Sequence, residues 1–112
     1  ANVKTGTLYI KVVSDNACSK FHTDGYKLRL FSTYLGKGTE WIPEAATNRK
    51  GLGKSNELIV KDSSQIKQMK AFEVGILKGE RRNSPHMVKG IVHKSPEILK
   101  SNEKRIILRV DV

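Results

Sequence analysis

The chain of 112 residues lacks the features that mark disulfide-stabilised, secreted and membrane-spanning proteins. Its single cysteine, Cys18, cannot form a disulfide within the chain. No apolar run approaches the roughly 18 residues that a transmembrane helix needs, and the first five residues lack the apolar stretch of a signal peptide. We therefore expect one domain spanning residues 1–112, without a membrane span, in the cytoplasm or the nucleoid or nucleus.

Acidic residues are also scarce. The chain has 11 Asp and Glu against 21 Lys and Arg, which gives a formal net charge of +10. Most of the excess lies in residues 49–112, whereas six of the seven aromatic residues lie in the first 41. A positive charge of this size on a short chain favours a polyanionic partner, above all a nucleic acid.

Alternating apolar and polar residues are the main structural pattern, and they predict short β-strands. The predicted strands cover residues 7–13, 26–35, 57–61, 71–77, 87–93 and 104–110, with a short strand candidate at 40–42 that Pro43 ends and short helices at 65–70 and 95–100. This order predicts a mostly-β fold of about six strands with one or two short helices. Either a small barrel of the oligonucleotide/oligosaccharide-binding (OB-like) kind or a two-layer β-sandwich fits it.

The first two long strands offer a candidate binding surface. The alternation predicts that Leu8, Ile10 and Val12, and likewise Leu28 and Leu30, face the core. If the two strands pair, one outer face combines rings and cations, which suits stacking on unpaired bases and contact with phosphates. The predicted binding residues on and beside this face are Tyr9, Lys11, Lys27, Arg29, Phe31 and Tyr34.

Two loops add further candidate phosphate contacts. The segment 48–55 places Arg49, Lys50 and Lys54 around two glycines, and a predicted hairpin tip carries Arg81 and Arg82. The last strand is rich in Ile, Leu and Val. We expect it at a sheet edge, where pairing with a second copy would form a homodimer.

Metal and catalytic patterns are weak in this sequence. Cys18, His22, His86 and His93 offer four zinc ligands, but their spacings match no compact zinc module. The segment His22-Thr23-Asp24 suits the orientation of an imidazole, yet no nucleophile pattern accompanies it. We therefore expect no catalytic residue, no metal and no cofactor.

The sequence favours a non-catalytic protein that binds single-stranded nucleic acid largely without regard to sequence, with DNA preferred over RNA. One alternative is a β-sandwich module that binds a protein or an anionic lipid. Residues 24–30 resemble the early strand of a C2 domain, although the later aspartates that would bind calcium are missing. A second alternative is a small basic ribonuclease that uses His and Arg side chains.

Overall fold

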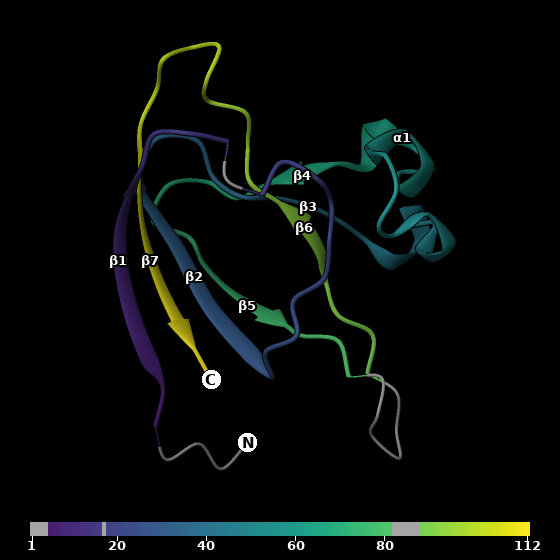
Figure 1. Ribbon diagram of the computed structural model, residues 1–112, viewed down its shortest axis with the longest axis horizontal. Coiled ribbons are helices and arrows are strands. Elements are labelled where there is room, and N and C mark those ends of the chain that lie inside the picture. The colour runs from purple at the N-terminus through teal and green to yellow at the C-terminus, as the bar shows by residue number, and fades with distance from the viewer. Residues whose placement is uncertain (1–4, 17, 82–87) are drawn as a thin grey trace.

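The computed structural model describes residues 5–16, 18–81 and 88–112, and they form two antiparallel sheets (Figure 1). The larger sheet has the strand order β1-β7-β2-β5: β1 (Thr7–Val13), β7 (Arg105–Asp111), β2 (Leu28–Leu35) and β5 (Val74–Lys78). The smaller sheet has the order β4-β3-β6: β4 (Lys67–Gln68), β3 (Glu40–Ile42) and β6 (Val92–Lys94). The mostly-β prediction is confirmed, and the described strands form two open sheets rather than a closed barrel.

Within the described residues, helical structure is confined to one α-helix and three 3-10 turns. These are α1 (Asn56–Ile59), η1 (Glu44–Ala46), η2 (Arg49–Gly51) and η3 (Ser63–Gln65). They fall within residues 44–65, on the far side of the smaller sheet from the larger one (Figure 1). No helix in the described ranges has the length and hydrophobicity to cross a bilayer.

Three predicted elements are wrong. Residues 57–61 were expected to be a strand, but most of that segment lies in α1. The helix expected at 65–70 gives way to β4, because Lys67 and Gln68 pair with β3. The helix expected at 95–100 does not form: residues 95–98 have no regular structure and a turn follows at 99–102. The side chain of Asn16 accepts hydrogen bonds from the backbone N–H groups of Ile98 and Leu99 at 2.8 and 3.0 Å.

Strand order also differs from the expectation. β7 lies in the centre of the larger sheet, between β1 and β2, instead of at an edge. Arg109 is therefore paired with Tyr9 on one side and with Phe31 on the other. The direct pairing of β1 with β2 is therefore wrong, and the predicted residues of the two strands share a face only through β7, which lies between them.

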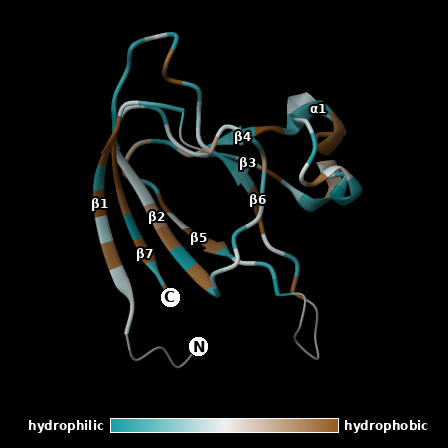
Figure 2. Ribbon diagram, in the orientation of Figure 1, coloured by the Kyte–Doolittle hydropathy of each residue, from teal (hydrophilic) through white to brown (hydrophobic). Residues whose placement is uncertain are grey.

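The larger sheet turns the opposite face inward from the one expected. Leu8, Ile10 and Val12 are 60–68% exposed, whereas Phe31, predicted to face outward, is 8% exposed. Figure 2 shows the hydrophobic bands that recur along β1, β7 and β2. Alternation groups residues by face, but it does not say which face the rest of the chain covers.

The buried apolar residues form two clusters. One joins Phe21, Ile42, Ile59 and Val92, and so ties α1 to the smaller sheet. The other joins three residues of the larger sheet, Phe31, Leu77 and Ile107. Ile91, from the segment before β6, packs against this second cluster. The second cluster lies between the sheets, beside the polar site described next.

Candidate metal centre

Two histidines far apart in the sequence are brought together by a backbone bridge. The N–H of His22 donates to the carbonyl of His93 at 2.9 Å, and the N–H of His93 donates to the carbonyl of His22 at 3.0 Å. Residues paired in this way project their side chains to the same side. The two imidazole rings accordingly lie with centroids 4.6 Å apart.

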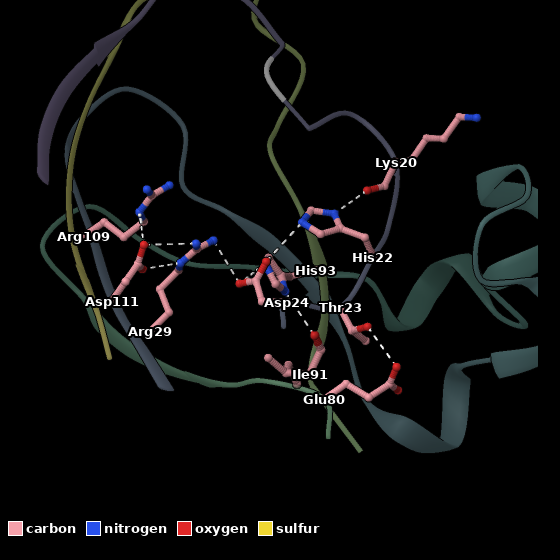
Figure 3. A network of polar contacts seen from close by, with 10 residues as sticks. All are labelled: Lys20, His22, Thr23, Asp24, Arg29, Glu80, Ile91, His93, Arg109 and Asp111. Atoms are coloured by element: carbon pink, nitrogen blue, oxygen red, sulfur yellow. Dashed lines mark hydrogen bonds and ion pairs between the residues drawn. The ribbon is translucent and has the colours of Figure 1, made fainter. Parts of the chain in front are cut away.

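Asp24 completes a group of three candidate ligands. It follows His22 by two residues in an extended segment, and successive alternate side chains share a face. Its Oδ2 lies 3.3 Å from Nε2 of His93, and its Oδ1 lies 3.6 Å from Nε2 of His22 (Figure 3). One ligand atom from each residue falls within 4.8 Å of the other two, so the three can surround a single ion.

Both imidazoles are held so that Nε2 faces the carboxylate. Nδ1 of His22 lies 2.8 Å from the carbonyl of Lys20, and Nδ1 of His93 lies 3.0 Å from the carbonyl of Ile91 (Figure 3). A carbonyl only accepts, so each Nδ1 donates to its carbonyl and Nε2 is the ring nitrogen that faces Asp24. Two ring nitrogens that face one carboxylate at this range are stabilised by a proton or by a cation between them. Metal-bound histidines are typically oriented by the same backbone contact.

A buried ion-pair network supports Asp24 from the other side. Nη1 of Arg29 lies 3.0 Å from Oδ2 of Asp24, while Nε and Nη2 donate to the two oxygens of Asp111 at 2.6 and 3.2 Å. Nε of Arg109 lies 3.1 Å from Oδ2 of Asp111, within ion-pair range but without hydrogen-bond alignment. Glu80 N–H also donates to the carbonyl of Asp24 at 2.8 Å, which fixes the backbone.

The network determines the charge of Asp24. Burial by itself would raise the pKa of this carboxyl, but the hydrogen bonds of His22 and His93 and the nearby charges outweigh burial and hold its pKa far below the ordinary 3.8. The network therefore favours the ionised form of Asp24. The hydrogen bond to Asp24 raises the pKa of His22, although burial opposes that change.

Two of the three ligands border a cavity of about 310 Å³ between the sheets. His22 and His93 line it, together with Arg29, Arg105, Arg109 and the apolar residues of the second cluster. A larger cavity of about 610 Å³ lies against β5 and is more apolar, but none of the three ligands lines it. The smaller cavity is therefore the one that borders the candidate metal ligands.

The chain matches, over residues 2–111, the family model described as "Protein of unknown function (DUF1826)". It belongs to the DUF1826 family. No curated protein and no solved structure matches it. For this DUF1826 protein, the evidence on function comes from the geometry of the site.

The structure separates the residues that were predicted to bind nucleic acid. Phe31 is buried in the core and Arg29 is held by Asp24 and Asp111, so neither lies on an open surface. Tyr9 is half-buried, with the guanidinium of Arg109 4.4 Å from its ring centroid, and Arg49 pairs with Glu44 and Glu80. The other described candidates are exposed: Lys11, Lys27, Tyr34, Lys50, Lys54 and Arg81. Arg82 and His86 lie outside the described residues.

Sequence reasoning missed the role of Asp24 as a partner of both histidines. It grouped His22 and His93 with Cys18, which lies at an exposed position on the rim of the same cavity. The available signal was the His-x-Asp spacing at 22–24 on an extended segment, followed by one later histidine in a strand. Two imidazoles and one carboxylate are a recurrent iron-binding set.

Proposed function

We propose that the protein is an enzyme with a mononuclear metal centre of the non-haem iron(II) type, formed by His22, Asp24 and His93. The observation that carries the proposal is the convergence of two imidazole Nε2 atoms on one carboxylate, with one ligand atom from each residue within 4.8 Å of the other two. This proposal departs from the expectation of a non-catalytic protein. An oxygenase reaction is the class that two histidines and one carboxylate with open coordination positions support best.

The donor set favours iron(II) over other metals. Imidazole nitrogen suits iron, zinc and copper, and a carboxylate oxygen is a harder donor that iron(II) also accepts. Three protein ligands leave positions for dioxygen and for a second small molecule. Catalytic zinc sites also use three protein ligands. If the protein binds zinc and does not bind iron(II), the assignment of iron is wrong.

The protein side chains have distinct tasks in such a centre. The carbonyls of Lys20 and Ile91 orient the imidazoles, and Arg29 fixes the carboxylate of Asp24. Phe31 and Leu77 give the cavity an apolar wall that limits water near the ligands. A bound iron(II) ion supplies one-electron chemistry and a binding position for dioxygen.

Anaerobic titration of the metal-free protein with iron(II) tests the proposal. We expect one ion per chain. Replacement of His22 or Asp24 by alanine should reduce the affinity by more than the roughly 10- to 100-fold that is typical when a residue hydrogen-bonded to a metal ligand is changed. His86→Ala, which removes the remaining histidine, is the matched control and should bind normally. Equal affinity of wild type and His22→Ala would exclude this centre.

Single-stranded nucleic-acid binding is a second candidate function, favoured by one observation. The net charge is +10, and Lys50 and Lys54 are exposed in one loop. Binding through these side chains would depend steeply on salt, with a loss of about one power of salt per phosphate contacted. A titration with oligo(dT) at several salt concentrations tests it, and binding that ignores salt would reject it.

A further inference from the structure

Arg105 is a fully buried cation whose described contacts are all neutral. The residue is 1% exposed at the start of β7. Its Nε donates to the carbonyl of Lys37 at 2.7 Å, and Nη2 donates to the hydroxyls of Thr33 and Thr39 at 3.4 and 3.3 Å. None of the ion pairs among the described residues includes Arg105, and Nη1 donates to none of them. Burying a guanidinium without a counterion is costly, so the site suits an anion.

The neighbouring charges do not compensate Arg105. Arg29 is matched by Asp24 and Asp111, and Asp111 also faces Arg109. These two carboxylates and two guanidiniums balance one another, and Lys11 and Asp15, which also line the cavity, contribute one charge of each sign. One positive charge therefore remains at Arg105, and a divalent ion at the candidate metal centre would add more.

The same cavity connects this charge to the metal centre. Arg105, His22 and His93 all line the cavity of about 310 Å³, and Phe31 and Ile107 lie on its wall. A volume of this size corresponds to about ten water molecules and so admits a molecule of about ten non-hydrogen atoms. Positive charge at two places, with apolar side chains on the wall, fits a short chain that carries an acid at each end.

We propose that this cavity binds a short dicarboxylic acid, with one carboxylate on Arg105 and the other directed to the His22–Asp24–His93 centre. The second contact rests on the proposed function, whereas the first depends on Arg105 alone. A planar guanidinium edge matches a carboxylate. A single uncompensated cation flanked by two hydroxyls suits this singly charged group better than a phosphate dianion.

Calorimetric titration with succinate tests the inference, with butyrate and inorganic phosphate as comparison ligands at matched ionic strength. Wild-type protein should bind succinate more tightly than either comparison ligand, and loading with iron(II) under anaerobic conditions should strengthen succinate binding. Arg105→Gln should weaken it by about 10- to 100-fold, the range for a lost hydrogen bond to a charged group. Arg105→Lys, which keeps the charge, should lose less. Lys100→Gln, which removes a charge from a side chain that is 90% exposed, should bind as wild type does.

Wild-type protein alone can overturn the inference, even if the Arg105 variants do not fold. Succinate binding no tighter than that of butyrate would show that the second carboxylate is not recognised. Tighter binding of phosphate would assign the site to a different anion. The titrations distinguish failure of one proposal from failure of the other. If succinate binds through Arg105 but iron(II) does not bind, the anion site stands and the metal centre is rejected. If iron(II) binds but succinate does not, the metal centre stands and the anion site is rejected.

Discussion

Replacement of Arg29 by glutamine tests whether this side chain is a buried structural partner or a free surface cation. The Arg29 side chain is 13% exposed, and its partners Asp24 and Asp111 are 10% and 4% exposed. Breaking a buried ion pair by removing one partner costs about 3–5 kcal/mol, because the remaining charge stays desolvated. Asp111 retains Arg109 at 3.1 Å, so we expect a cost near the lower limit, about 3 kcal/mol.

Urea denaturation of the metal-free protein measures this cost, and the single tryptophan, Trp41, provides the fluorescence signal. A double-mutant cycle with Asp111→Asn should show coupling, because the double variant leaves fewer unpaired charges than the two single variants together. Lys100→Gln serves as the surface control and should change the free energy of unfolding by less than about 0.5 kcal/mol. A similarly small effect of Arg29→Gln would refute the buried network and return Arg29 to the set of free cations.

Three further predictions concern the core, an acid-sensitive contact and the loop that carries Asp24. Phe31→Ala should lower the free energy of unfolding by about 3–5 kcal/mol because the ring is buried, whereas Tyr34→Ala, at 42% exposure, should cost less than about 1 kcal/mol in the same urea assay. The hydrogen bond from Arg49 lowers the pKa of Glu44 below its ordinary 4.5, so this pair stabilises the fold above that pH and its contribution is lost as the pH falls through the lowered value. Glu44→Gln should remove that part of the acid dependence of the urea midpoint. The effect should be less than about 1 kcal/mol because the Glu44 side chain is half exposed. An unchanged pH dependence in Glu44→Gln would contradict a stabilising pair between Glu44 and Arg49. Gly79→Ala would force a methyl group against the carbonyl of Tyr26 and should reduce iron(II) affinity by about tenfold or more, while Gly25→Ala, which meets no atom within 4 Å, should not.

The strand pattern was visible in the sequence, but its orientation was not. The alternation at 7–13 correctly predicts β1, yet the same alternation fits either face of the sheet toward the core. The segment 57–61 was misassigned because Leu58, Ile59 and Val60 match a strand pattern. In the fold, the side chain of Asn56 accepts a hydrogen bond from the backbone of Phe21 at 2.9 Å and anchors the start of α1.

The candidate site required tertiary information that no local pattern contains. His22 and Asp24 are close in the sequence, but their partner His93 is identified only by the bridge that joins two distant segments. Arg105 and Arg109 are four residues apart on β7, so their side chains share a face of the sheet. The strand order places that face inside the molecule. The sequence alone could not distinguish this inner face from a solvated one.

X-ray absorption spectroscopy of the iron-loaded protein identifies the atoms that bind the metal and so tests the proposed centre. We expect only nitrogen and oxygen ligands, with the outer-shell scattering of two imidazoles, and we expect that scattering to weaken in His93→Ala. A sulfur ligand from Cys18, or a spectrum unchanged by His93→Ala, would exclude a centre formed by His22, Asp24 and His93.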